Sequence, residues 1–269
     1  MLLNFREYGE RGGEPLLLLH GLFGSLDNWH TVARRLAEER WIVSIDLRNH
    51  GGSPHSPEFS YPLLAQDVAE VVDHLGVERA AVLGHSMGGK TAMELALSRP
   101  GKIARLIVVD IAPKRYPPHH EDLRDALLSV DLQAIGSRKA AEAALARRIP
   151  DQALRLFLLK NLSRDDHGRF RWELDLASIA ANFDAIWAAI NGERSYAGPV
   201  LFLRGARSHY IVDEDLPSIR RLFPRALLAT IEGAGHWVHA EQPESLIGTV
   251  ASFLRQDLTN DVETAHPLS

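Results

Sequence analysis

A serine with a glycine two residues away on either side, Gly84-x-Ser86-x-Gly88, lies between an apolar run and a helix-forming run. A strand that becomes a helix within so few residues must bend sharply, and the two glycines remove Cβ atoms that would collide there. Such a bend presents the serine hydroxyl as a nucleophile. The pattern also fits a serine that caps a helix in a glycine-rich turn, so other residues must decide.

The base that this serine would need is predicted in the loop at 232–239. A serine hydroxyl is a weak nucleophile until a base accepts its proton and an acid orients the base, and the partners follow in the order Ser, Asp or Glu, His. His236 follows a small Gly-Ala-Gly run that lets it lean over the edge of a sheet, whereas His239 is expected to pack or cap at the closing helix. We predict His236 as the base, with His20 and His85 shaping the site without titrating.

The acid has two candidates. Where an aspartate is common, after the strand predicted at 200–204, the chain has Ser208. Asp110 ends another apolar strand, and a buried carboxylate there needs a reason such as orienting an imidazolium. Asp213 is the alternative acid, although it also fits an acid-rich helix N-terminus. Asp110 is preferred, and Asp213 stays open.

Backbone N–H donors are expected on both sides of the serine, because a developing oxyanion needs donors already in position. Met87 directly follows Ser86 at the start of a helix, whose dipole favours negative charge. A second donor is expected from the glycine-rich loop at 20–24, either from Leu22 or from Phe23. A plain glycine turn would also explain that loop.

The elements that carry these residues alternate along the chain. Strands are predicted at 15–20, 41–46, 80–83, 103–110, 200–204 and 226–231, and helices at 27–40, 61–75, from the serine to about 99, 213–222 and 241–255. This alternation predicts an α/β fold, a mostly parallel sheet covered by helices on both faces. Between 111 and 196 the rhythm stops, and only helical patterns are found, at 121–132, 137–149, 151–163 and 173–190.

We therefore expect a core formed by residues 1–111 and 197–256, an all-helical cap at 112–196 and a flexible polar tail at 257–269. The cap carries apolar side chains that would line a pocket or form the cap's own core: Phe157, Leu158, Phe183, Ile186 and Trp187. Lys90, one turn into the helix after the serine, is expected in solvent or in a salt bridge.

Composition limits the classes of partner. The 269 residues carry a net charge of −5, which argues against nucleic acid, and contain no cysteine, which excludes thiol nucleophiles and disulfides. No apolar run approaches a membrane span, and the first residues do not resemble a signal peptide, so a cytoplasmic location is expected. No cofactor and no metal are expected.

Together these motifs resemble the α/β-hydrolase superfamily over nearly the whole chain. Its serine-esterase branch of YbfF-like and abhydrolase-domain-11-like proteins is the most similar, on the segments 20–29 (HGLFGSLDNW), 46–51 (DLRNHG), 84–93 (GHSMGGKTAM) and 233–239 (GAGHWVH). The resemblance implies an α/β-hydrolase fold and a cofactor-free carboxylesterase or thioesterase, a monomer or small homo-oligomer, acting on small to medium acyl groups. An aspartate at the place of Asp110 is a plausible acid in that branch.

Other functions of the same fold remain open. Carbon–carbon bond hydrolases, a related lyase and perhydrolases use a similar serine and histidine, and the cap pocket would decide among them. A hydrolase-like protein that binds a ligand without turnover is the alternative from another class. The presence of Ser86, His236 and a donor loop argues for an enzyme.

Overall fold

The computed structural model describes residues 1–118, 120–190 and 192–256. A seven-stranded sheet runs through it in the order β1-β3-β2-β4-β5-β8-β9, and every neighbouring pair is parallel except β1 with β3. Its strands are β1 (Phe5–Tyr8), β2 (Leu16–Leu19), β3 (Ile42–Ile45), β4 (Ala80–His85), β5 (Ile103–Val109), β8 (Val200–Gly205) and β9 (Ala226–Ile231). The predicted α/β-hydrolase fold is confirmed.

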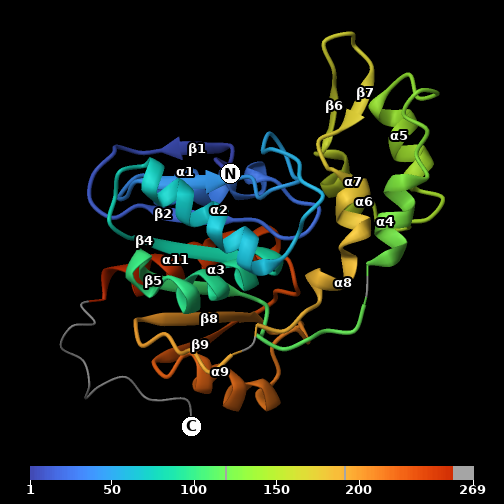
Figure 1. Ribbon diagram of the computed structural model, residues 1–269. Helices are drawn as coiled ribbons and strands as arrows, with labels where there is room; N and C mark the ends of the chain where they lie inside the picture. Colours follow the sequence, from blue (N-terminus) through green and yellow to red (C-terminus); the bar gives the residue numbers. More distant parts are fainter. Residues whose placement is uncertain (119, 191, 257–269) are drawn as a thin grey trace.

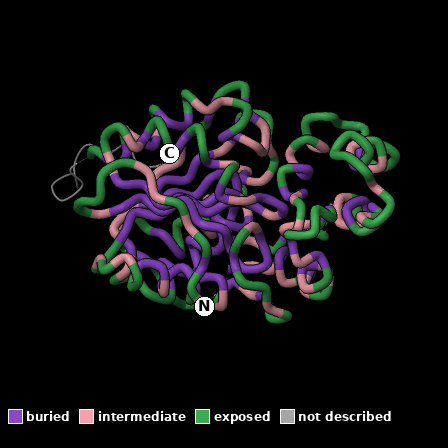
Figure 2. The backbone as a smooth tube through the Cα atoms, turned by 90° about the horizontal axis from the view of Figure 1, so that it is seen from above, coloured by how far each residue is buried: buried purple, intermediate pink, exposed green. Residues whose placement is uncertain are grey.

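Alternation along the strands divides the core into two layers. In β2, Leu16 and Leu18 face one side of the sheet, and Leu17 and Leu19 face the other, so all four are fully buried. The first layer packs under α1 (His30–Leu36) and α11 (Pro243–Arg255), and the second packs under α2 (Tyr61–His74), α3 (Met87–Ser98) and α9 (Leu216–Leu222). Figure 2 shows the buried strands at the centre of the core, with exposed segments around its outside.

Shorter elements complete the core: the 3-10 helices η1 (Leu26–Trp29), η2 (Pro100–Lys102) and η3 (Asp213–Asp215), and the one-turn helix α10 (Val238–Glu241). The sequence patterns did not reveal β1, because this edge strand is short, half-buried and mixes polar with aromatic residues. The predicted flexible tail at 257–269 lies outside the described residues.

The insertion forms a separate lobe beside one end of the sheet (Figure 1). Its helices are α4 (Glu121–Leu128), α5 (Arg138–Leu145), α6 (Gln152–Leu159), α7 (Leu176–Ala181) and α8 (Phe183–Ile186). The prediction that the cap is all-helical is wrong, because β6 (Leu162–Arg164) and β7 (Phe170–Trp172) form an antiparallel hairpin.

The hairpin turn explains that error. Asp165 accepts hydrogen bonds from the N–H groups of His167 and Arg169, and Gly168 adopts a φ of +76°. A side chain that satisfies the backbone locally and a glycine in the left-handed region favour a tight turn over a helix. The helix predicted at 151–163 accordingly ends at Leu159, and the one predicted at 173–190 is divided at Asn182.

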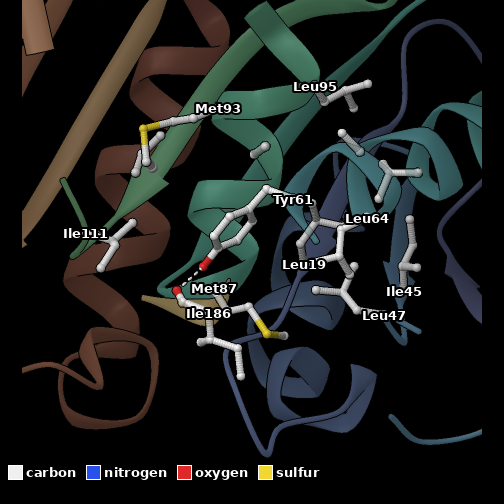
Figure 3. Packing of buried hydrophobic residues seen from close by; sticks show 14 of the residues in the cluster. Leu19, Ile45, Leu47, Tyr61, Leu64, Met87, Met93, Leu95, Ile111 and Ile186 are labelled. Carbon is white, nitrogen blue, oxygen red and sulfur yellow. Dashed lines mark hydrogen bonds between the residues drawn. The ribbon is translucent and has the colours of Figure 1, made fainter. Parts of the chain in front are cut away.

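Contacts join this cap to the core directly. The hydroxyl of Tyr61, at the start of α2, donates to the carbonyl oxygen of Ile186 at the end of α8 (2.5 Å; Figure 3). Within the described ranges, we find no helix with the length and apolar character to cross a membrane.

Candidate active site

Ser86 connects β4 to α3 in the sharp bend that the two glycines predict. Its φ of +53° and ψ of −116° are strained for a residue with a Cβ. A Cβ on Gly84 would lie 2.1 Å from the carbonyl oxygen of Gly88, and one on Gly88 would lie 2.5 Å from that of Leu19. Only glycine fits at either place. The Ser86 side chain forms no capping hydrogen bond within the described chain, which argues against the alternative role as a helix cap.

Asp110 and His236 are brought together at the ends of β5 and β9. Nδ1 of His236 donates to Oδ2 of Asp110 over 2.8 Å. The carboxylate is fully buried, and it also accepts from the N–H of Gly205 at Oδ1 (3.0 Å) and from the hydroxyl of Ser208 at Oδ2 (2.5 Å). Because a carboxylate only accepts, the neutral imidazole carries its proton on Nδ1 and presents a lone pair at Nε2.

Burial dominates the electrostatics of Asp110. Desolvation raises the pKa of its carboxyl to about 6, although the hydrogen bonds from Ser208 and Gly205 act in the opposite direction. Asp213, the alternative acid, has a side chain that is 76% exposed and pairs with Arg204 at 2.7 Å. The structure therefore places Asp110, and not Asp213, against the imidazole.

Ser208 is a contact that the sequence patterns did not identify. Its position after β8 pointed to the usual place of an acid, but nothing in the sequence indicated that its hydroxyl would reach a carboxylate on β5. Pairing of β8 beside β5 explains the contact, since Asp110 N–H donates to the carbonyl oxygen of Leu203 (2.7 Å).

The turn at 21–24 lies against the serine. A Cβ on Gly21 would lie 3.3 Å from that of Ser86, so the glycine permits this approach of the backbone. Leu22 and Phe23 are the central residues of the turn, which is closed by a hydrogen bond from Gly24 N–H to the oxygen of Gly21 (3.0 Å). Phe23 adopts a φ of +59°.

Three N–H groups in this corner are candidates for holding an anion. Among the described residues, the N–H groups of Leu22 and Phe23 have no intramolecular acceptor. Met87 opens α3, where the first N–H groups have no partner inside the helix. The cap steadies the turn, because Nδ2 of Asn161 donates to the carbonyl oxygen of Phe23 (2.7 Å).

The three histidines that surround the site are held neutral by burial. Desolvation lowers the pKa of His20 to about 4, and it lowers those of His85 and His239 well below the usual range. Nε2 of His85 donates to the carbonyl oxygen of His236 (2.8 Å) and so supports the backbone that carries the base candidate. His239 packs between Trp29 and His85.

A narrow pocket lies above these groups between core and cap, and about 30 Å³ of it is accessible to the centre of a water molecule. It is lined by Ser86 and His236, by Leu22, Phe23 and Met87, and by side chains of the cap, among them Phe157, Ile186 and Trp187. Of the five cap residues considered as pocket lining, Leu158 and Phe183 belong instead to the buried core. A mostly apolar lining with a few polar groups is typical of a small-molecule site.

Lys90 also reaches this cavity, and the prediction that it lies in solvent or in a salt bridge is wrong. Its side chain is 1% exposed, and Nζ donates to the carbonyl oxygens of Lys114 (3.0 Å), Trp187 (3.4 Å) and Ala188 (2.6 Å). Desolvation lowers its pKa to about 7. The three acceptors belong to the two chain segments that connect cap and core, so Lys90 fastens both to α3.

Metal ligands are a separate question. In the ranges that the structure describes, no three His, Asp or Glu side chains are grouped as metal ligands would be. The site consists of a serine on a bend, a histidine paired with a buried carboxylate, and candidate N–H donors from the turn at 21–24 and from the start of α3.

This fold and this set of residues define the class of protein. A model of the α/β hydrolase fold family matches residues 14–243, and the chain belongs to this family. It is 40% identical over 247 residues to the sn-1-specific diacylglycerol lipase ABHD11 of Mus musculus (89% of this chain, 80% of the relative). It is 33% identical over 260 residues to the esterase YbfF of Escherichia coli (94% and 99%).

A solved structure supports the same assignment. A marine microorganism esterase superposes with a TM-score of 0.91 at 43% identity, covering 94% of this chain and 99% of that one. The predicted YbfF-like and abhydrolase-domain-11-like branch is confirmed. The chain is a carboxylesterase-type hydrolase.

Proposed function

We propose that the chain cleaves carboxylic esters through an acyl-enzyme on Ser86, with His236 as general base and Asp110 as the acid that orients it. The observation that carries the proposal is the 2.8 Å hydrogen bond between Asp110 and Nδ1 of His236, on a cavity that Ser86 also lines. The bond holds the tautomer in which Nε2 can accept a proton.

The chain's own groups supply each step. Ser86 Oγ attacks the ester carbonyl while Nε2 of His236 takes its proton, and the imidazolium that forms is stabilised by Asp110. The oxyanion is held by the N–H of Met87 and by that of Leu22 or Phe23. His236 then protonates the leaving alcohol. Water, deprotonated by His236, attacks the acyl-enzyme by the same route and releases the acid and free Ser86.

The substrates proposed are esters of small to medium acyl groups, with acyl thioesters as a second possibility. The cap contributes an apolar wall through Phe157, Ile186 and Trp187, which suits an acyl chain. The mouse relative is named as a diacylglycerol lipase, so diacylglycerols belong in the test. We propose that the reaction needs no cofactor or metal and that the protein has no nucleic acid or membrane as a partner. We also propose that it is a cytoplasmic monomer or small homo-oligomer.

The deciding experiment compares initial rates on p-nitrophenyl esters of increasing acyl length, on acyl-CoAs and on diacylglycerols, for the native chain and for Ser86→Ala. We expect ester turnover that Ser86→Ala abolishes. Turnover that survives the substitution would disprove the acyl-enzyme. Absence of ester and thioester turnover, with cleavage of a 1,3-diketone, would favour carbon–carbon bond hydrolysis, and binding without any cleavage would favour the ligand-binding alternative.

A further inference from the structure

We propose that Tyr210 is a positioning residue for this reaction: its ring lies flat on the His236 imidazole and favours the imidazolium that forms when Ser86 gives up its proton. The inference rests on the proposed function. It assigns a role to the loop after β8, which holds Ser208 where an acid is commonly found.

The geometry of this pair differs from that of the other described rings at the site. The centroids of Tyr210 and His236 are 3.8 Å apart and the rings are within 15° of parallel. The His85 ring lies 4.7 Å from that of His236 and is tilted by 45°. Of these two neighbouring rings, Tyr210 is the one stacked face to face on the imidazole.

Several hydrogen bonds fix the tyrosine in this place. Its carbonyl oxygen accepts from the hydroxyl of Tyr116 (2.5 Å), its N–H donates to the hydroxyl oxygen of Ser208 (3.2 Å), and its own hydroxyl lies 3.4 Å from Nε2 of His120. Ser208 in turn donates to Asp110. One short loop thus contacts both members of the acid–base pair, the carboxylate by a hydroxyl and the imidazole by a ring.

The face of an aromatic ring carries partial negative charge, so a cation above it is stabilised relative to the neutral species. Asp110, which follows β5, His85 from β4 and Tyr210 contact His236 directly, and His239 acts on it from α10. Arg207 and His209 of the Tyr210 loop line a shallow pocket together with the imidazole, and Arg207 pairs with Glu241 (2.6 Å). Burial keeps His85 and His239 neutral and raises the pKa of the Tyr210 hydroxyl. Asp110 is the charged group hydrogen-bonded to the imidazole, and the tyrosine ring adds a second, weaker attraction for the imidazolium.

The test compares Tyr210→Leu, which removes the ring, with Tyr210→Phe, which keeps the ring and removes the hydroxyl. Without the ring, the imidazolium is less favoured, so the acidic limb of kcat/KM against pH should move to lower pH by about half a unit, with roughly a threefold loss of kcat. Tyr210→Phe should leave the limb in place. An unmoved limb in Tyr210→Leu, or an equal shift in both variants, would overturn the proposal.

A second measurement is independent of activity and of the cavity that a smaller side chain leaves. Pentafluorophenylalanine at position 210 keeps the shape of phenylalanine and reverses the charge distribution of the ring. By NMR of labelled histidine, the His236 titration should move to lower pH than in Tyr210→Phe, and identical titrations would contradict the proposal. The NMR titration needs no turnover. A chain without esterase activity would therefore disprove the proposed function, while the effect of the residue 210 ring on the His236 pKa could still be measured.

Discussion

Asp110 and His236 are joined by a hydrogen bond of 2.8 Å although 126 residues separate them along the chain. The sheet order explains the contact, because β5 and β9 are separated only by β8 and all three strands end at the same edge. The carboxylate that contacts the imidazole therefore follows β5, the first strand after α3. The loop after β8 contributes the Ser208 hydroxyl to the same carboxylate.

Substitution of Asp110 by asparagine should remove most of the activity. The amide would keep the shape of the side chain but would no longer hold His236 in the Nδ1–H tautomer, so we expect kcat for p-nitrophenyl butyrate to fall by roughly 10³- to 10⁴-fold. Asp213→Asn, which changes an exposed partner of Arg204, is the matched control and should keep kcat within about twofold. Near-native turnover by Asp110→Asn would refute this assignment of the acid.

The pH dependence of stability should change in the same variant. The pKa of the Asp110 carboxyl is raised to about 6 in the fold, above the ordinary 3.8, so the folded state binds the proton more tightly than the unfolded state. The stability that this carboxyl contributes is complete below about pH 3.8 and is lost as pH rises through about 6. The native chain loses this contribution at high pH and the asparagine variant does not. The free energy of unfolding of Asp110→Asn minus that of the native chain should therefore be up to about 3 kcal/mol larger at pH 8 than at pH 4, measured by urea unfolding. A difference between the two chains that is independent of pH would contradict this.

Two replacements of Ser86 should separate its chemistry from its backbone strain. Both Ser86→Ala and Ser86→Gly lack the hydroxyl, so kcat should fall by roughly 10⁴- to 10⁶-fold in each. Because the φ at this position is +53°, glycine relieves strain that alanine keeps, and Ser86→Gly should be about 1 kcal/mol more stable than Ser86→Ala. Thermal unfolding of the two variants, equally inactive, provides the comparison, and equal stability would exclude strain at this residue.

Removal of the Lys90 ammonium should loosen the cap. Lys90→Met keeps the aliphatic stem but removes the donor to the carbonyl oxygens of Lys114 and Ala188, whereas that of Trp187 still accepts from the N–H of Tyr116 (3.0 Å). The free energy of unfolding should therefore fall by about 2 kcal/mol. Lys139→Met, an exposed change on α5 of the same cap, is the control and should be within about 0.5 kcal/mol of the native chain. Limited proteolysis should cut the connecting segments faster in Lys90→Met alone. Equal cleavage of both variants would show that the ammonium does not fasten the cap.

The sequence was sufficient for the features that local chemistry determines. A glycine on each side of Ser86 predicts the bend because the backbone contacts leave no room for a Cβ, and the apolar runs predict the strands because a buried parallel sheet needs them. The order of Ser86, Asp110 and His236 along the alternating elements also placed all three at one edge.

What the sequence did not determine depends on contacts between distant segments. Three contacts follow from how β5, β8 and β9 lie side by side: Asp110, and not Asp213, on the imidazole, the Ser208 hydroxyl on Asp110, and the Tyr210 ring on His236. For Lys90 the sequence predicts solvent or a salt bridge, because a lysine in a helix is usually exposed, whereas its carbonyl acceptors come from segments 24 to 98 residues away. The sequence alone thus identified the candidate site residues. Their contact partners were decided by the tertiary structure, since only folding brings donor and acceptor within hydrogen-bonding distance.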